Sequence, residues 1–407
     1  EKITQAAKVD MIDWENLLDN SVPEKLIIES PEYITNSGVY LASLDKDTWN
    51  YYIIARVFQS FTGYLDDTSY QHYFNYMKVL TGQKEPKPLW KRVLSTVETL
   101  LGELISRDYV DIYFPPSSKT QMIKLVDNLI ESYRDRLRKV DWMGSDTKKS
   151  ALKKLDRIGV KIGYPDKWRD YSQLSLDNIE NYLDQYLQTH LFEFQYEWDQ
   201  MDKPVDCSKW EMNAHEINAY YHPTQHEIVF PAGILQSPFF DPSLNEAVNY
   251  GGIGAVIGHE ITHGFDDQGR QYDLDGNLND WWTKEDTTEF KRLTQKLVEQ
   301  YNKYVVEDTH LNGELTLGEN IADLGGLTIS YYAWKSVNSS DKGDSKDFFN
   351  SWAKIWRNLI RPQEAKRLVV IDPHSPGKYR VNGVVRNMPE YYNAFSMDVP
   401  SDCIKIW

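Results

Sequence analysis

Cysteine is scarce in this chain: the 407 residues include two, Cys207 and Cys403. Two cysteines can form one bridge at most, so the sequence excludes the small secreted domains whose cores depend on several disulfides. One bridge and two free thiols both remain open at this point.

Long apolar runs are absent as well. No stretch approaches the ~18 consecutive apolar residues that a membrane-spanning helix needs, and we predict no membrane segment in this chain. No secretory signal is visible. The sequence opens with Glu1 rather than methionine, from which we expect either processing or a piece of a longer protein.

Positive charge is in deficit, with 45 Lys and Arg residues against 61 Asp and Glu and a formal net charge of −16. Nucleic-acid binding relies on clustered lysine and arginine to neutralise phosphates, so we predict no nucleic-acid partner. The acidic balance mildly favours neutral or basic substrates, but it is more often a means of keeping a protein soluble.

Repeats and low-complexity tracts are missing too, and the organisation follows from apolar periodicity. Four segments carry apolar side chains at helical spacing: residues 89–109, 117–140, 145–158 and 179–198. We expect the second of these to begin at a serine cap. Residues 217–235 instead alternate apolar and polar side chains, which predicts one or two strands about a turn at His222–His226. The pattern therefore predicts a mainly α fold with a small β part, and a boundary near residue 203.

The most informative stretch is "GHEITHGFDD", in which His259 and His263 lie four residues apart with Glu260 directly after the first. Histidine makes up 9 of the 407 residues, so chance predicts this pattern only about 0.01 times in such a chain. The pair His222 and His226 has the same spacing, but the proline between them indicates a turn rather than a helical ligand face.

Helical geometry makes a metal site plausible in this stretch. If residues 247–265 are helical, Ile253, Ile257 and Ile261 form a core-facing stripe. The two histidines then leave the opposite face together, about 200° around the helix at 100° per residue, and one turn apart. The alternative is a pair of hydrogen-bonded polar residues on a buried helix, which the intervening glutamate disfavours.

Two histidines do not complete a catalytic zinc site, which takes three protein ligands and keeps a position for water. The segment 311–334 supplies Glu319 and Asp323, four residues apart on one face of a second helix. Alone, such an acidic pair usually marks a solvated surface. Gly325 and Gly326 directly after it are unfavourable in an ordinary surface helix, so we expect a close approach of two backbones.

Four motifs in this order, "NAYYHPTQHEIVFPAGIL", "GHEITHGFDD", "GENIADLGGL" and "HSPGKYR", resemble the neprilysin family of zinc endopeptidases. "LTGQKEPKPLWKRVL" and "DRIGVKIGYPDKWRDYS" are similar to its bacterial branch, the oligopeptidase O enzymes. The resemblance implies a two-lobed, mainly helical metallopeptidase with a thermolysin-like core. Residues 1–203 would form a helical lobe that caps the active-site cavity, and residues 204–407 the zinc-binding catalytic domain.

The resemblance also implies roles for single residues at the metal centre. His259, His263 and Glu319 match the ligands of one zinc ion per chain. Glu260 matches the general base that activates the zinc-bound water. Asp323 matches a catalytic carboxylate that orients a ligand histidine.

Further motif positions match residues that contact the substrate. His374 and Arg380 correspond to the catalytic pair that stabilises the transition state, and Arg380 also holds the substrate backbone. Asn218 and Ala219 correspond to residues that bind the peptide main chain. The carboxylates of "GFDD", Asp266 and Asp267, end the helix or form a turn, with an outer role at the metal left open.

Oligopeptides are therefore the expected substrates, and zinc endopeptidase the expected activity. The alternatives are a different zinc hydrolase, a non-catalytic peptide-binding relative, which the intact Glu260 disfavours, and an incomplete enzyme. Family members are longer, so we expect an N-terminal segment of the same precursor as a partner. The family's C-terminal disulfide is not carried over, because Cys403 stands four residues before Trp407. Bacterial cytoplasm and export both remain open.

Overall fold

The computed structural model describes residues 30–201, 203–337 and 342–407. The chain forms two compact units, Glu1–Phe74 and Asn75–Trp407. Helices dominate the described residues, and strands are few and short, as the sequence predicts. None of the described helices combines the length and apolarity needed to cross a membrane. The predicted boundary near residue 203 stays a prediction.

The first unit contains α3 (Pro31–Ser43), α4 (Lys46–Phe61) and the start of α5 (Asp67–Thr81). Asp45 caps α4 by accepting a hydrogen bond from the backbone N–H of Thr48. No residue of α4 is buried, although the helix carries several large apolar side chains.

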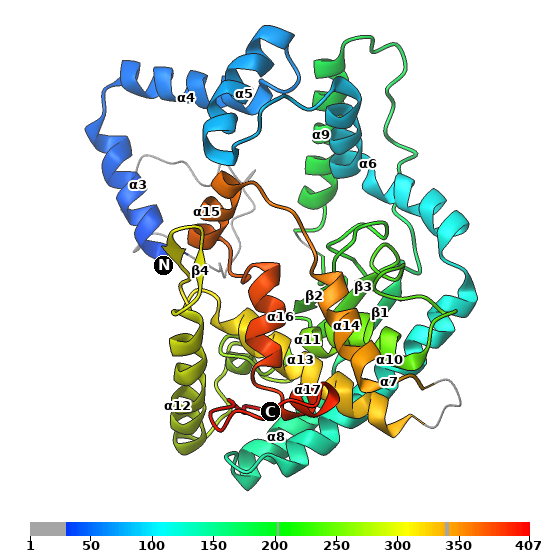
Figure 1. Ribbon diagram of the computed structural model, residues 1–407. Helices are drawn as coiled ribbons and strands as arrows, with labels where there is room; N and C mark the ends of the chain where they lie inside the picture. The colour runs from blue at the N-terminus through cyan, green and yellow to red at the C-terminus, as the bar shows by residue number, and fades with distance from the viewer. Residues whose placement is uncertain (1–29, 202, 338–341) are drawn as a thin grey trace. The chain divides into compact units, whose positions relative to one another are not determined.

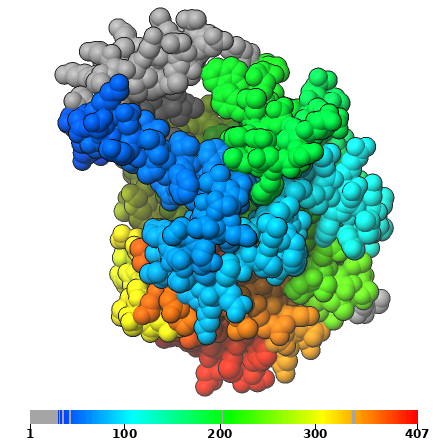
Figure 2. Space-filling view, turned by 90° about the horizontal axis from the view of Figure 1, so that it is seen from above, coloured from blue at the N-terminus to red at the C-terminus, as the bar shows by residue number. Residues whose placement is uncertain are grey.

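The second unit begins with the long helices that the periodicity predicts: α6 (Leu89–Tyr113), α7 (Pro116–Lys139), α8 (Ser145–Asp156) and α9 (Tyr182–Trp198). Helices α6 and α9 lie side by side, cyan and green in Figure 2. The predicted serine cap of α7 is wrong. This helix begins at Pro116, whose fixed φ suits a first turn and which needs no N–H partner.

Two short sheets make up the β part. The larger has the order β1-β3-β2, with β1 (Gly159–Gly163) parallel to β3 (Glu227–Pro231) and β2 (Tyr220–His222) antiparallel to it. The predicted turn between the last two strands is confirmed. The smaller sheet pairs β4 (Val305–Val306) with β5 (Thr309–His310).

The segment that carries the histidines is helical throughout but not uniformly α-helical. It runs through α10 (Glu246–Asn249), a π-helical turn η1 (Tyr250–Gly254) and α11 (Ala255–His263). The predicted core stripe is confirmed, since Ile253, Ile257 and Ile261 are fully buried. The helix ends at His263, two residues earlier than predicted, so Gly264 and Phe265 belong to the following turn.

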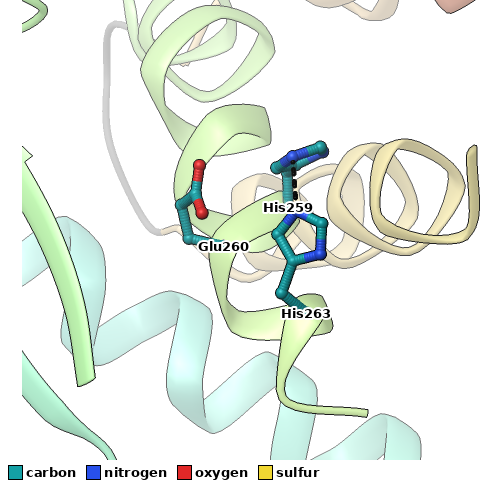
Figure 3. A group of neighbouring side chains, drawn as sticks. All are labelled: His259, Glu260 and His263. Atoms are coloured by element: carbon teal, nitrogen blue, oxygen red, sulfur yellow. Dashed lines mark hydrogen bonds between the residues drawn. The ribbon is translucent and has the colours of Figure 1, made fainter. Parts of the chain in front are cut away.

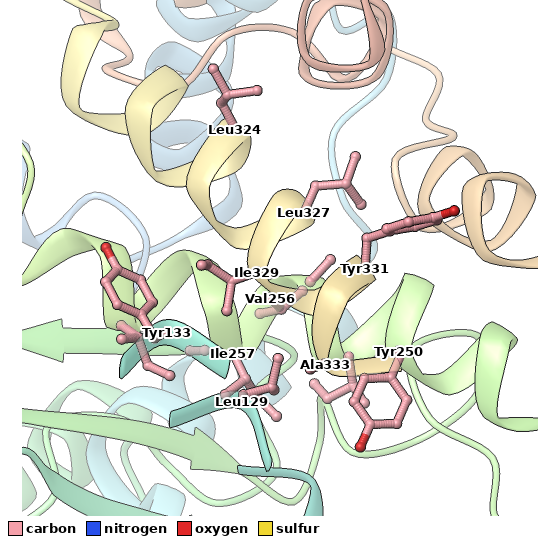
Figure 4. Packing of buried hydrophobic residues seen from close by; sticks show 14 of the residues in the cluster. Leu129, Tyr133, Tyr250, Val256, Ile257, Leu324, Leu327, Ile329, Tyr331 and Ala333 are labelled. Carbon is pink, nitrogen blue, oxygen red and sulfur yellow. The ribbon is translucent and has the colours of Figure 1, made fainter. Parts of the chain in front are cut away.

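Helix α13 (Leu317–Ser336) packs along α11, and glycines set the distance between them. A Cβ at Gly258 would lie 2.7 Å from the carbonyl oxygen of Gly326, and a Cβ at Gly326 would overlap the backbone nitrogen of His259. The predicted close backbone approach is therefore confirmed. Apolar side chains, among them Val256 and Leu327, fill the space beside this contact (Figure 4).

The remaining helices are η2 (Gly269–Gln271), α12 (Lys284–Tyr301), α14 (Ser345–Ile355), α15 (Pro362–Ile371), α16 (Gly377–Val385) and α17 (Pro389–Ala394). Of these, α12 and α16 pack against α13. The C-terminal Trp407 is buried against Tyr133 and Phe265. Cys207 and Cys403 are both free thiols, which settles the alternative that the sequence left open.

Replacing Gly326 by alanine tests the contact between α11 and α13. The added methyl group overlaps backbone atoms, which cannot move aside as a flexible side chain does. We expect the free energy of unfolding to fall by about 1–3 kcal/mol, as for other overpacked cores. Thermal or denaturant unfolding measures this. Gly63→Ala is the matched control, because nothing lies within 4 Å of a Cβ there. Equal effects of the two substitutions would contradict the assignment.

Candidate metal centre

His259 and His263 present their imidazoles to each other from adjacent turns of α11. Their Nε2 atoms lie 3.0 Å apart, and Figure 3 shows the two rings beside each other with Glu260 next to them. His259, Glu260 and His263 each offer a ligand atom, and these atoms lie within 4.8 Å of one another. The four-residue spacing thus produces the convergence that the sequence predicts.

Glu319, on the first turn of α13, brings a carboxylate to the same point. Its Oε2 atom is 3.2 Å from Nε2 of His259, and its Oε1 atom is 3.6 Å from Nε2 of His263. The Oε2 atom is buried and has no hydrogen-bond partner. Two imidazole nitrogens and one carboxylate are a donor set of catalytic zinc sites, and an unpartnered buried oxygen among them fits a metal ligand.

The far nitrogen of each histidine meets a carboxylate. Nδ1 of His259 lies 2.8 Å from Asp323 Oδ1, and Nδ1 of His263 lies 2.7 Å from Asp266 Oδ2. A carboxylate accepts, so Nδ1 carries the proton and each Nε2 lone pair faces the centre. Asp323 thus takes its predicted place. Asp266, whose role the sequence left open, does for the second histidine what Asp323 does for the first.

Arg380, on α16, completes this carboxylate network. Its Nε and Nη2 groups donate to Asp323 at 2.7 and 2.6 Å, and its guanidinium lies 3.8 Å from the ring centre of Trp356. Burial raises the pKa of Asp323, but the Arg380 charge and the hydrogen bond from His259 outweigh it and hold that pKa below its ordinary value. Asp323 therefore stays ionised and oriented.

Glu260 has the opposite electrostatic setting. It is buried, and burial raises its pKa, while the charges of the two histidines and Arg380 oppose that change. A carboxylate with a raised pKa holds a transferred proton more readily, which suits a general base. Glu319 differs: burial also disfavours its charge, but the neighbouring His259, followed by His263 and His374, lowers its pKa well below the ordinary value.

The metal centre lies in the wall of a cavity of about 720 Å³. All the predicted site residues line it: Asn218, Ala219, His259, Glu260, His263, Glu319, Asp323, His374 and Arg380. Ile234, Phe239 and Val256 give one part of the wall an apolar surface. The structure brings these residues together, and their roles remain predictions.

His374 reaches the cavity from the loop before α16. Its Nε2 atom is 3.3 Å from Glu319 Oε2, and its Nδ1 atom is 2.8 Å from Asp372 Oδ1. Asp372 also accepts from the backbone N–H of His374 and so fixes the loop. The sequence analysis missed Asp372, although its position two residues before the histidine is a common turn-forming arrangement.

The second histidine pair is not a metal site. His222 Nε2 lies 3.0 Å from Glu211, whereas His226 bonds to Tyr221 and to the backbone of Lys154. The two rings therefore serve different partners, as the proline between them predicts.

Comparison with known proteins agrees with this geometry. Two models described as peptidase family M13 match residues 2–165 and 218–405. Endothelin-converting enzyme 1 of Bos taurus is 36% identical over 389 residues, covering 91% of this chain and 52% of the relative. Neprilysin-1 of Caenorhabditis elegans is 34% identical over 418 residues, covering 95% of this chain and 55% of the relative. The chain spans about half the length of the curated relatives it matches.

Solved structures give the same result. The zinc metalloprotease Zmp1 of Mycobacterium tuberculosis, in complex with an inhibitor, superimposes with a TM-score of 0.88 at 41% identity, covering 94% of this chain and 61% of that one. PepO from Lactobacillus rhamnosis superimposes with a TM-score of 0.79 at 32% identity, covering 86% of this chain and 55% of that one.

Substitutions of Glu319 and Asp323 distinguish a proposed metal ligand from a carboxylate that orients a ligand. Glu319→Ala leaves two protein ligands, so we expect tight zinc binding to be lost. Asp323→Asn keeps the shape but weakens the acceptor of His259, and such changes reduce metal affinity about 10–100-fold. A zinc titration of both variants measures this, with exposed Glu314→Gln as the control. If Asp323→Asn lost zinc as completely as Glu319→Ala, Asp323 would be a ligand itself.

Proposed function

Because the chain belongs to peptidase family M13, the neprilysin family, we propose that it is the catalytic portion of a zinc endopeptidase that hydrolyses oligopeptides. The family is zinc-dependent, and its members are metalloendopeptidases. The observation that carries the proposal is the unpartnered Oε2 atom of Glu319, buried beside the facing Nε2 atoms of two histidines.

One zinc ion per chain would be held by His259, His263 and Glu319. When bound, zinc polarises a carbonyl group and lowers the pKa of water to around 7, which makes a nucleophile available at neutral pH. The protein's contribution is orientation. Asp323 and Asp266 keep both imidazoles in the tautomer that turns Nε2 towards the centre.

Glu260 would take the proton of the attacking water and pass it to the leaving amine. It follows a proposed ligand on the same helix, and its carboxylate lies within 4.8 Å of the ligand nitrogens of both histidines. Burial raises its pKa, so the carboxyl group can hold the proton between the two transfers.

His374 and Arg380 would stabilise the negative charge that forms on the substrate carbonyl oxygen. Nε2 of His374 and Nη2 of Arg380 lie 3.3 and 3.8 Å from Glu319 Oε2, beside the proposed ligand. Because Asp372 accepts from Nδ1 of His374, Nε2 would donate from the ring protonated on both nitrogens. A donor in such a position commonly contributes about 3 kcal/mol to transition-state stabilisation. Arg380 is held in place by Asp323 and Trp356, and this limits the reorganisation needed during the reaction.

The substrate main chain would bind along β2. This strand pairs with β3 on one side, and among the described residues no strand pairs with its other edge. Asn218 and Ala219 lie directly before it and line the cavity. An extended peptide can add to such an edge through backbone hydrogen bonds. Ile234, Phe239 and Val256 would then receive a hydrophobic side chain on the amine side of the cleaved bond.

A further segment of the same precursor would be a partner of this chain. The chain spans about half the length of its relatives. Helix α4 exposes Tyr51, Ile54 and Phe58, which are 74%, 64% and 50% accessible. Soluble proteins rarely leave a contiguous apolar surface of this kind uncovered. Residues 1–203 would act with that segment as the helical lobe over the cavity, and full activity would require both.

Glu260→Gln tests the base. The amide cannot accept the proton, but the three ligands remain, so zinc should stay bound while peptide cleavage falls by several orders of magnitude. Peptide hydrolysis and zinc content of the same sample measure the two effects. Glu285→Gln, at an exposed position on α12, is the matched control and should be fully active. Near-normal turnover by Glu260→Gln would exclude Glu260 as the base.

Substrate size tests the enclosed two-lobed architecture that the family implies. We expect the complete enzyme to cleave peptides of up to a few dozen residues and to leave folded proteins intact. A series of peptides of increasing length, followed by a native globular protein and its unfolded form, gives the measurement. Efficient digestion of the native protein would contradict an enclosed site.

A further inference from the structure

Lys154 is buried, whereas lysine side chains normally lie at the protein surface. It lies on α8, and 1% of the residue is accessible to solvent. Its Nζ group donates three hydrogen bonds, to the carbonyl oxygens of Gly264, Gly269 and Tyr272 at 2.7, 2.8 and 2.7 Å. An ammonium group has three hydrogens, so each of them has an acceptor within the single segment 264–272.

That segment follows the metal centre directly. It begins one residue after His263 and contains Asp266, whose Oδ2 atom meets Nδ1 of that histidine. The other oxygen, Oδ1, accepts from the backbone N–H groups of Gln268 and Gly269 at 2.9 and 2.7 Å. The place of the Asp266 carboxylate is therefore set by the turn around it. Lys154 binds carbonyl groups on both sides of that turn.

The turn is folded tightly against the end of α11. A Cβ at Gly269 would overlap the carbonyl group of His263, so the chain comes back over the ligand-bearing residue. Carbonyl oxygens crowded together in this way repel one another, and they are buried from water. A cation between them offsets the repulsion. A side chain without donors would leave the carbonyl oxygen of Gly264 without its partner, while those of Gly269 and Tyr272 would keep only the backbone N–H of Tyr272 and the indole N–H of Trp281.

Lys154 is also linked, through His226, to Tyr221 in the wall of the cavity. Its own carbonyl oxygen accepts a hydrogen bond from His226 Nε2 at 2.7 Å, and Nδ1 of His226 lies 3.0 Å from the hydroxyl of Tyr221. Tyr221 belongs to β2 and lines the cavity. Burial lowers the pKa of His226 to about 4, so the ring is neutral and Nδ1 accepts from the hydroxyl group. One residue thus connects the edge strand with the turn of Asp266.

We infer that Lys154 is a positioning residue of the metal centre: its ammonium group holds segment 264–272 so that Asp266 meets His263. The inference rests on the proposed function, because it takes His263 to be a metal ligand. Burial lowers the pKa of Lys154 to about 7, and the charges of Asp266 and Asp273 offset only part of that change. The inference therefore rests on the three hydrogen bonds and not on the charge.

Lys154→Met tests the inference, with Lys153→Met as the matched control on the exposed side of the same helix. Methionine keeps the length and apolar stem but has no donor. In the metal-free 407-residue chain, we expect the amide hydrogens of Gln268 and Gly269 to exchange faster in Lys154→Met than in wild type. Zinc affinity should fall about 10–100-fold, as for other changes to groups that orient metal ligands. The control should match wild type in both measurements.

A double variant separates a positioning role from general stabilisation. If Lys154 acts through Asp266, the double variant Lys154→Met/Asp266→Asn should bind zinc less than about threefold more weakly than Asp266→Asn alone. If the losses of zinc affinity in the two single variants multiplied fully in the double variant, the inference would be overturned. Amide exchange and zinc affinity at the wild-type level in Lys154→Met would also overturn it. If that variant does not fold, Lys154→Arg decides. Its planar donors cannot converge on three carbonyl groups, so affinity should still fall, and wild-type affinity would contradict the inference. A wild-type chain that bound no zinc would instead overturn the proposed function.

Discussion

The contact between α11 and α13 is the constraint on which the site depends. Glycines at positions 258 and 326 let the two backbones approach more closely than any side chain allows. Only at this distance does a carboxylate on the first turn of one helix reach imidazoles on the last turns of the other. The apolar stripe around Ile257 buries the opposite face of α11 and prevents rotation about its axis. The three residues of the proposed metal centre thus come from two helices, without a contribution from a loop.

The electrostatic surroundings give the carboxyl groups near the two histidines different pKa values. Three carboxylates lie close together, and like charges in a buried space raise each other's pKa values. Asp323 and Glu319 are kept ionised by Arg380 and the histidines, whereas burial raises the pKa of Glu260. Carboxylates are therefore proposed as ligand, as orienting acceptor and as base, and the difference comes from the neighbours of each side chain rather than from its chemistry.

Much of this arrangement can be predicted from the sequence. The rest cannot, and the reasons are physical. Period and spacing predict the long helices, the core stripe on α11 and the convergence of His259 and His263, because these depend on local geometry. Glu319 lies on a second helix, and its place beside the histidines follows from the family resemblance and not from spacing. The π-helical turn at Tyr250 leaves no such signal, since the polar and apolar order barely changes. Asp266 and Asp372 act within turns, whose exact course the sequence does not define. Lys154 acts on carbonyl oxygens, and every residue has one, so no pattern of side chains identifies its partners.

Among the described residues no strand pairs with the second edge of β2, and this determines what the proposed peptide-binding cleft would distinguish. Backbone N–H and C=O groups are the same in every peptide, so pairing along an edge recognises an extended conformation and not a sequence. A segment already committed to a helix or to a sheet of its own has no free backbone groups to offer. Under the proposed function, selection would begin before any side chain is recognised: a flexible stretch of a given sequence would bind, whereas the same sequence in a folded state would not.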